Sequence, residues 1–388
     1  MAEDWSRNDV LAVLGGGTMG AGIAALACER GVTTILCDAS PALAAAARER
    51  VEGQLARRRQ RGKVDAAAEA AALGRLTVSA ELEAAAPAAL AIEAVPERLE
   101  LKRSLFERLA AIAPDAVLAS NTSSLPIADL AAGSAHAGRL LGLHFFNPPG
   151  AIALVELVAT PATGAAALAR ARALAMALGR QPVTVADGPG FLVNRCARPY
   201  YLEALRTVAA GAAEPAAVDA ALEAEGFPLG PFRLIDLVGI DVNLAVARSL
   251  WEQAGHEPRW RPSPIQEAMV AAGRLGRKGG GGFYDADGAP LPLPAGSAAG
   301  PAVVPLGPEE IVTRVAAQLV NEAHFALEAG VAAAADVDPA MTAALRWPRG
   351  PLSWGEELGR TRLVALLDEL AGPGADPVYR VAPSLRAA

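Results

Sequence analysis

The sequence predicts an α/β domain with a doubly wound, mostly parallel sheet, followed by two all-α helical domains that duplicate one another. Three observations lead to this fold class. Short apolar runs alternate with helical stretches up to residue 187, the pattern from Gly190 onward is helical without convincing strands, and landmarks of that helical part recur later in the chain. Strands that alternate with helices form a parallel sheet covered on both faces.

The expected strands are short, apolar and bounded by turn residues. They are Val10–Leu14, Val32–Cys37, Leu76–Val78, Leu90–Val95, Val117–Ser120, Leu140–Phe146, Ala153–Val158 and Pro182–Val185. Helical stretches are expected at 21–30, 41–75, 97–112 and 164–179. Because alanine favours helices and hides the apolar period, these boundaries are approximate.

A duplication organises the second half. Glu203 and Glu322, Gly211 and Gly330, and Asp219 and Asp338 are each 119 residues apart, and Gly230-Pro231 recurs as Gly350-Pro351 after 120. The Pro/Ala/Gly stretch 286–307 between the copies has no hydrophobic period, as in a linker. We therefore expect domains at 1–187, 188–285 and 308–388, with 286–307 as the linker.

Composition excludes several classes of protein. With 35 Lys+Arg against 42 Asp+Glu, the net charge of −7 has the wrong sign for a nucleic-acid binder. Three unpatterned cysteines are too few for a disulfide framework or a metal site, which favours a reducing compartment. The acidic N-terminus does not resemble a signal peptide, and no apolar run is long enough to span a membrane. The sequence predicts a cytoplasmic protein.

A glycine loop follows the first expected strand and opens a helix. Its G-x-G-x-x-G pattern is followed by the acidic Asp38, 23 positions after Gly15. This strand, loop, helix, strand and acidic residue form the Rossmann-type unit that binds dinucleotides. The residues expected to hold the pyrophosphate are Gly15, Gly17, Thr18, Met19 and Gly20.

Asp38 favours NAD as the cofactor, because a carboxylate accepts ribose hydroxyls but repels a 2′-phosphate. The residues after it, Ala39, Ser40 and Pro41, supply no cation. NADP, a flavin, and a glycine turn that serves only packing remain the alternatives.

His144 stands out among the four histidines. It ends an apolar run at the expected carboxyl edge of the sheet, where α/β folds bind ligands. Glu156, 12 residues later, is expected on a neighbouring segment, where it can hold the imidazole in one tautomer. This pair has the arrangement of a general base that takes a hydroxyl proton. His136, His256 and His324 are interpreted as surface or packing residues.

Ordered motifs carry a resemblance over nearly the whole chain. After the glycine loop come Ile92–Glu97, Ser120–Ser124, His144–Pro148, Leu154–Glu156, Asp187–Arg195, Gly230–Phe232, Asp236–Gly239 and Gly276–Tyr284. In this order they resemble the L-3-hydroxyacyl-CoA dehydrogenase family. The second copy, with Tyr379–Leu385 at its end, resembles the long members linked to phenylacetate and adipyl-CoA-type catabolism.

The resemblance implies NAD-dependent oxidation of an L-3-hydroxyacyl-CoA to a 3-oxoacyl-CoA, in fatty-acid or phenylacetate-type catabolism. His144 is the implied base, Glu156 its orienting acid, and Ser120 and Asn194 the groups that hydrogen-bond the substrate oxygens. Helix or turn capping is the competing role of Ser120 and Asn194.

Glu97, Lys102 and Asn147 match family positions near the nicotinamide ribose, although the first two also fit a solvated helix face. Lys63, in the basic cluster Arg57–Lys63, matches a CoA-contacting lysine, with a solvated face as the alternative.

Two features leave the substrate and the assembly open. Residues Pro149–Ala153 differ from the family's larger turn, so a non-CoA 3-hydroxy acid such as carnitine or a sugar acid is one alternative. A non-catalytic NAD-binding structural protein is another. The second copy has Thr313 where the first has Asn194, which predicts that it is non-catalytic. In shorter family members the helical domains pair in a dimer, so this chain is expected to be a homodimer or a pseudo-dimeric monomer.

Overall fold

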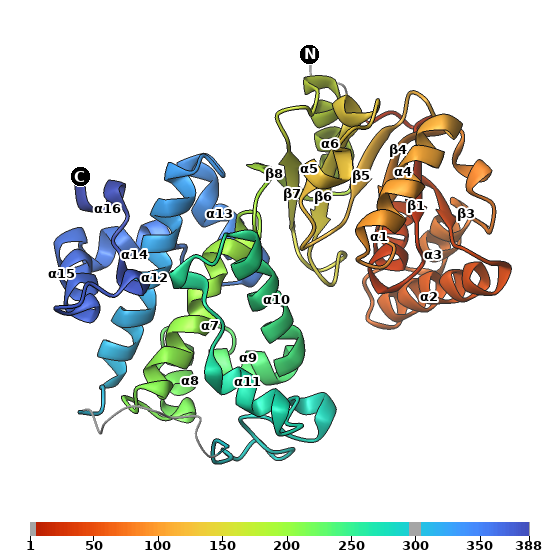
Figure 1. Ribbon diagram of the computed structural model, residues 1–388. Coiled ribbons are helices and arrows are strands. Elements are labelled where there is room, and N and C mark those ends of the chain that lie inside the picture. Colours follow the sequence, from red (N-terminus) through yellow and green to blue (C-terminus); the bar gives the residue numbers. More distant parts are fainter. Residues whose placement is uncertain (1–4, 295–303, 388) are drawn as a thin grey trace. The chain divides into compact units, whose positions relative to one another are not determined.

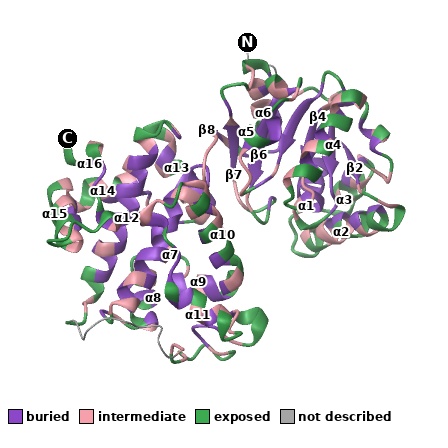
Figure 2. Cartoon of the chain, viewed as in Figure 1, coloured by how far each residue is buried: buried purple, intermediate pink, exposed green. Residues whose placement is uncertain are grey.

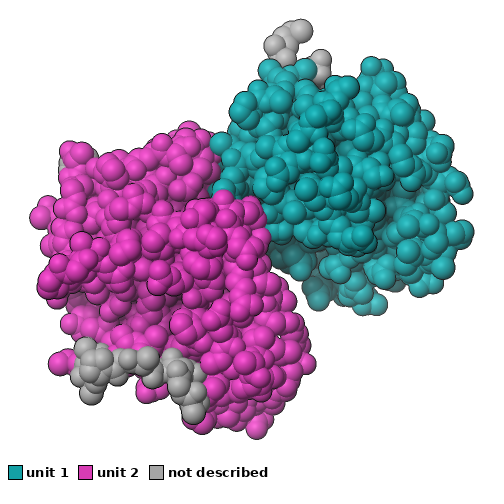
Figure 3. Space-filling model, viewed as in Figure 1, with its two compact units in different colours: residues 1–191 teal, residues 192–388 magenta. Residues whose placement is uncertain are grey.

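The computed structural model describes residues 5–294 and 304–387, which form parts of two compact units, Met1–Phe191 and Leu192–Ala388 (Figure 3). The sequence placed the first boundary after residue 187 and expected the two helical copies as separate domains. Both copies lie within the second of these units, and their division into two domains stays a prediction. The predicted linker 286–307 lies partly outside the described residues.

The first unit is built on one eight-stranded sheet with the order β3-β2-β1-β4-β5-β6-β7-β8 (Figure 1). The strands are β1 Val10–Leu14, β2 Thr33–Cys37, β3 Leu76–Ser79, β4 Ala88–Glu93, β5 Val117–Ser120, β6 Leu140–Phe145, β7 Leu154–Ala159 and β8 Gln181–Ala186. Only β6 and β7 pair antiparallel. The predicted doubly wound, mostly parallel sheet is confirmed, and its order reverses between β1 and β4, the switch point where such folds bind ligands.

Helices cover this sheet and connect its strands (Figure 1). They are α1 Thr18–Glu29, α2 Pro41–Gln60, α3 Ala66–Leu73, α4 Leu99–Ile112, α5 Ile127–Ala131 and α6 Ala165–Ala177. The single helix expected over 41–75 is wrong. The chain turns at Gly62, whose φ is +67°, and Asp65 then caps α3 by accepting from the Ala68 N–H at 2.7 Å.

The two faces of the sheet differ in chemistry. Alternate strand residues such as Leu11, Ile92 and Leu143 pack with α1, α2, α3 and α6 in one apolar core. Side chains alternate along a strand, and residues directly opposite each other on paired strands project from the same face. The register therefore puts Glu93, Ser120, His144 and Glu156 together on the other face.

The second unit contains two copies of one helical pattern (Figure 1). The first copy, residues 192–291, contains α7 Val193–Ala209, α8 Pro215–Ala224, α9 Pro231–Val238, α10 Ile240–Gln253, η3 Pro258–Trp260, α11 Pro264–Ala271 and η4 Arg277–Gly279. The second copy, residues 308–387, contains α12 Pro308–Glu328, α13 Ala334–Leu345, α14 Pro351–Leu358, α15 Arg360–Ala371, η5 Pro377–Tyr379 and α16 Pro383–Ala387. The predicted duplication is thus present as two matching series of helices.

The repeated landmarks have a common structural role. Asp219 accepts from the Phe232 and Arg233 N–H groups at the start of α9, and Asp338 accepts from the Leu352 and Ser353 N–H groups at the start of α14. A Cβ on Gly230 or Gly350 would lie 2.4 or 2.3 Å from that aspartate. Each copy therefore needs both the capping Asp and the small residue beside it.

The copies pack against each other reciprocally, mainly through the buried helices α7 and α12 (Figure 2). Glu203 of the first copy binds Arg314 Nε at 2.5 Å and Tyr379 Oη at 3.2 Å in the second. Glu322 of the second copy binds Arg195 Nε at 2.8 Å and Trp260 Nε1 at 3.1 Å in the first. All three pairs of equivalent residues are related by the 119-residue offset.

Phe227 and its counterpart Trp347 touch each other, with ring centroids 5.3 Å apart. Contact between equivalent residues, together with exchanged ion pairs, is the geometry of a two-fold interface. Here it forms within one chain.

Within residues 5–294 and 304–387, no helix is long and apolar enough to cross a bilayer, and no group of three or more metal-ligating side chains is found. Cys28, Cys37 and Cys196 are all buried.

Candidate active site

Two neighbouring strands bring His144 and Glu156 together. The residues are direct partners in the antiparallel register of β6 and β7, and His144 Nδ1 lies 2.7 Å from Glu156 Oε2. The Glu156 side chain is fully buried and the His144 side chain is 6% exposed. Because Nδ1 faces the carboxylate, Nε2 is the ring nitrogen left for proton transfer.

Two aromatic rings hold the imidazole from other sides. The Phe146 ring centroid lies 4.6 Å from that of His144, and the Phe191 ring meets it edge-on at 5.6 Å. An imidazole fixed by a carboxylate and two rings has little rotational freedom. The geometry suits a base that acts in one direction.

Ser120 ends β5 and hydrogen-bonds to a buried acid. Its Oγ donates to Glu93 Oε2 at 2.7 Å and accepts from the Thr122 N–H at 3.3 Å. A hydroxyl has one donor hydrogen and two acceptor lone pairs. Its hydrogen is therefore used by Glu93, and the oxygen keeps one lone pair for another donor.

Lys102 lies inside this polar cluster, so the alternative of a solvated lysine is wrong. Its side chain is 1% exposed, and its ammonium binds Glu93 Oε1 at 2.6 Å, Glu97 Oε2 at 3.0 Å and the Val95 carbonyl at 3.3 Å. An ammonium has three donors, and all are used here.

Glu97 is the exposed end of the same cluster, with 36% of its side chain accessible. Burial alone would raise its pKa, but the Lys102 charge and hydrogen bonds from Thr122 and Ser124 outweigh this, so the pKa of Glu97 lies below its usual value. The Glu97 carboxylate is thus kept ionised and can accept hydroxyl hydrogens.

The glycine loop has the shape that a dinucleotide requires. Gly15 has φ +96°, and a Cβ on Gly20 would lie 1.8 Å from the Gly15 carbonyl oxygen, so the loop and α1 pack in close contact. A Cβ on Gly17 would meet nothing within 4 Å, and no side chain caps α1. Open space before free helix N–H groups is what a pyrophosphate needs, and the loop fits NAD.

Asp38 lies at the end of β2 beside this loop. Its carboxylate accepts from the Gly16 N–H at 2.8 Å and the Ala39 N–H at 2.7 Å, which fixes its direction and leaves lone pairs for ribose hydroxyls. Arg50 of α2 donates to the Gly16 carbonyl at 3.1 Å. Arg50 could not be predicted from the sequence, because it lies 34 residues from its partner.

The structure also places the remaining predicted site residues. Asn194 is the second residue of α7, and the N-cap position of that helix is occupied by Leu192. Asn147 is exposed after β6, and Lys63 is exposed in the turn after α2. In the basic cluster, Arg58 binds Glu29 and Arg59 binds Glu69, which neutralises part of its charge.

Glu93 is the site residue that sequence reasoning missed. It stands in the quoted Ile92–Glu97 motif, and an acid that ends an apolar strand was the available signal. Its burial and its two partners depend on the register of β4 with β5.

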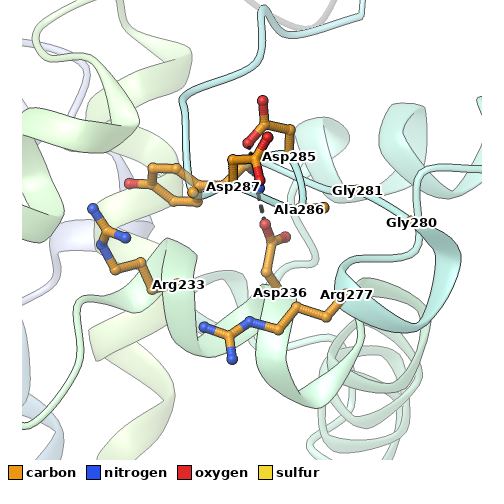
Figure 4. A pocket seen from close by; sticks show the side chains of 10 residues that line it. Arg233, Asp236, Arg277, Gly280, Gly281, Asp285, Ala286 and Asp287 are labelled. Carbon is orange, nitrogen blue, oxygen red and sulfur yellow. Dashed lines mark hydrogen bonds between the residues drawn. The ribbon is translucent and has the colours of Figure 1, made fainter.

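A cavity of about 460 Å³ lies in the first helical copy (Figure 4). Arg233, Asp236 and Arg277 line it, and the Asp236 carboxylate accepts from the Phe283 and Tyr284 N–H groups at 3.0 and 2.9 Å. Asp236 therefore holds the glycine-rich turn 276–284, which is a structural role. The buried His144–Glu156 pair, in contrast, lies in the first unit.

Comparison with known proteins identifies the family of this chain. Residues 10–188 match the family model described as 3-hydroxyacyl-CoA dehydrogenase, NAD binding domain. Residues 190–286 and 311–388 match the model described as 3-hydroxyacyl-CoA dehydrogenase, C-terminal domain. The C-terminal family domain thus occurs twice, in agreement with the two helical copies.

Similar proteins occur in a long and a short form. The 3-hydroxyadipyl-CoA dehydrogenase of Escherichia coli K12 is 35% identical over 97% of this chain and 96% of its own length. The 3-hydroxybutyryl-CoA dehydrogenase of Mycobacterium tuberculosis is 44% identical but covers 70% of this chain with 96% of its own. A crystal structure of 3-hydroxybutyryl-CoA dehydrogenase from Escherichia coli K12 has a TM-score of 0.89 at 34% identity, over 97% of both chains. This chain belongs to the 3-hydroxyacyl-CoA dehydrogenase family and is an NAD-dependent enzyme of that family.

Proposed function

We propose that this chain oxidises the C3 hydroxyl of an L-3-hydroxyacyl-CoA, with His144 as the general base and Glu156 as the group that orients it. The observation that carries the proposal is the direct pairing of His144 with Glu156 across β6 and β7, at 2.7 Å. The pair lies on the sheet face shared with Ser120 and Glu93.

The proton path follows from the ring nitrogens. His144 Nε2 accepts the hydroxyl proton as the O–H bond breaks, and the imidazolium that forms is stabilised by the Glu156 carboxylate at Nδ1. NAD⁺, which the glycine loop and Asp38 would hold, would supply the acceptor for the C3 hydrogen and its electron pair. The carbinol then becomes a ketone, and the proton stays on His144 until solvent removes it.

Ser120 and Asn194 have different parts in this proposal. Because Ser120 donates its hydrogen to Glu93, its oxygen offers an acceptor to a donor group of the ligands rather than a donor to the ketone. Asn194 has an amide N–H₂ for which no hydrogen-bond partner is found in residues 5–294 and 304–387, and such a donor suits the substrate oxygens. A donor of this kind is worth about 10²- to 10³-fold in kcat.

Glu97 and Asn147 are proposed to bind the nicotinamide ribose. Lys102, whose three donors are used internally, is proposed to hold Glu97 in place. Lys63 and the basic residues at the end of α2 are proposed to receive the CoA phosphates, because they form a local cluster of positive charge on a chain of net charge −7.

A panel of substrates tests the proposal. NADH formation is measured with 3-hydroxybutyryl-CoA, a longer 3-hydroxyacyl-CoA, 3-hydroxyadipyl-CoA and, as the non-CoA probe, carnitine. We expect turnover of at least one CoA ester and none of carnitine, with inhibition by free CoA. Turnover of carnitine without CoA inhibition would favour the non-CoA alternative, and NAD binding without any turnover would favour a structural protein.

A further inference from the structure

In the second helical copy, the buried Glu322 binds Arg195 of the first copy, the residue that follows Asn194. We infer that Glu322 of the second copy is a positioning residue for Asn194, acting through Arg195. The inference rests on the proposed role of Asn194 at the substrate oxygens. It assigns the degenerate copy a part in the reaction besides packing.

The Glu322 carboxylate accepts hydrogen bonds from three side chains of the first copy. The carboxylate is 2% exposed, and its partners are Arg195 Nε at 2.8 Å, Arg259 Nε at 3.1 Å and Trp260 Nε1 at 3.1 Å. The Arg195 guanidinium also lies over the Trp260 ring, 5.4 Å from its centroid. One buried acid on α12 thus fixes the side chain that follows Asn194 in the chain.

Neighbouring residues on a helix point about 100° apart. Fixing the Arg195 side chain toward α12 therefore fixes the rotation of the first turn of α7, and with it the direction of the Asn194 side chain. Among the described residues no hydrogen bond of the Asn194 side chain is found, so no hydrogen bond of its own fixes the direction of this amide.

The backbone of this first turn is held weakly. Pro199 lies inside α7 and has no N–H to donate to the carbonyl of Arg195, four residues earlier. The equivalent of Pro199 in the second copy is Gln318, which has that N–H. The first turn of α7 therefore depends more on its side-chain anchor than the matching turn of α12 does.

The chain contains its own control. Glu203 is the counterpart of Glu322, is equally buried, and binds the counterpart arginine, Arg314, at 2.5 Å. The residue before Arg314 is Thr313, in place of Asn194. Loss of either acid removes the same kind of contact between the copies, but only Glu322 holds the turn that carries Asn194.

The experiment compares Glu322→Gln with Glu203→Gln in the full-length protein. Melting temperature, kcat and KM are measured with NAD⁺ and the best 3-hydroxyacyl-CoA. We expect similar losses of melting temperature in both variants, but about a tenfold or larger loss of kcat only in Glu322→Gln, since small misplacements of reacting groups are costly. Equal kcat values in the two variants, beside an active wild type, would overturn the inference and leave the proposed function intact.

A second measurement separates positioning from general damage. In an Asn194→Ala background, Glu322→Gln should lower kcat by less than about twofold, because two residues that act as one unit are not additive. A full additional tenfold loss would overturn the inference.

If the glutamine variants do not fold, Arg195→Lys and Arg314→Lys provide the same comparison with the charge retained. A kcat loss confined to Arg195→Lys supports the inference, and equal kcat values overturn it. A wild type without activity on any 3-hydroxyacyl-CoA would instead count against the proposed function.

Discussion

The two helical copies share their packing residues but differ where a ligand would be met. Both keep the capping aspartate, the Gly-Pro helix start and the buried glutamate on the long helix. They differ at the start of that helix. Asn194 lies in the first turn of α7, whereas Thr313 lies five residues inside α12, which begins at Pro308.

The extra turn of α12 changes what the equivalent position can do. Thr313 is 5% exposed, and its hydroxyl donates to the Glu309 carbonyl at 2.8 Å, which is an internal helix contact. In the first copy Gly188-Pro189-Gly190 occupies the matching segment, and α7 begins only at Val193. The second copy therefore keeps the residues that bind its partner copy, but it has a buried Thr313 at the position where the first copy has Asn194.

The largest effect is expected from removal of the second copy. A chain that ends at residue 305 would expose the buried face of α7 and remove the second-copy partners of Arg195, Arg259 and Glu203. Unpaired buried charges and an exposed apolar face favour insolubility or self-association. Sedimentation should show aggregates or a new oligomer. A soluble, active monomer would contradict the proposed pseudo-dimer.

The second-largest effect is expected when Asn194 is substituted and compared with substitution of its counterpart in the second copy, Thr313. Asn194→Ala should lower kcat about 10²- to 10³-fold by removal of a donor to the substrate oxygens. Thr313→Ala, its counterpart, should leave kcat within about twofold of wild type. Steady-state kinetics of the two variants check this, and equal kcat values would mean that the asymmetry of the copies has no catalytic meaning.

A smaller effect is expected on the pH dependence of the free energy of unfolding, through the carboxyl group of Asp219. Burial raises the pKa of Asp219 to about 6, above its unfolded value, so the folded state binds an extra proton between about pH 4 and pH 6. Protonation of Asp219 contributes up to about 3 kcal/mol to the free energy of unfolding. This contribution is complete below about pH 4 and is lost as the pH rises through about 6.

Thermal unfolding of wild type and Asp219→Asn from pH 4.5 to 7 tests this. We expect a flatter pH dependence in the variant. Asp338→Asn removes the corresponding helix cap in the second copy and controls for that loss. An unchanged slope in Asp219→Asn would show that Asp219 is not the titrating group.

The first unit was predictable because its signals are local. Strand, glycine loop, helix and Asp38 follow one another within 30 residues, and the apolar runs marked all eight strands. The pairing of His144 with Glu156 was expected from their spacing in the chain and the order of motifs. The strand register that brings them to 2.7 Å had to come from the structure.

The charge clusters could not be predicted, because their members are far apart in sequence. Glu93 meets Ser120 across 27 residues, and Glu322 meets Arg195 across 127. Lys102 was assigned to the ribose from its family position, but its burial among Glu93, Glu97 and Val95 depends on where α4 packs. An offset of 119 revealed the duplication without revealing that each acid binds the opposite copy.

The base assignment is tested most directly by His144→Gln, compared with wild type for NADH production from a 3-hydroxyacyl-CoA at saturating NAD⁺. Binding of NAD⁺, followed separately by calorimetry, should be unchanged. If His144 is the general base, the variant loses roughly 10²- to 10⁴-fold in kcat, which is the usual contribution of such a group. A variant that keeps more than about a tenth of the wild-type kcat would contradict this assignment.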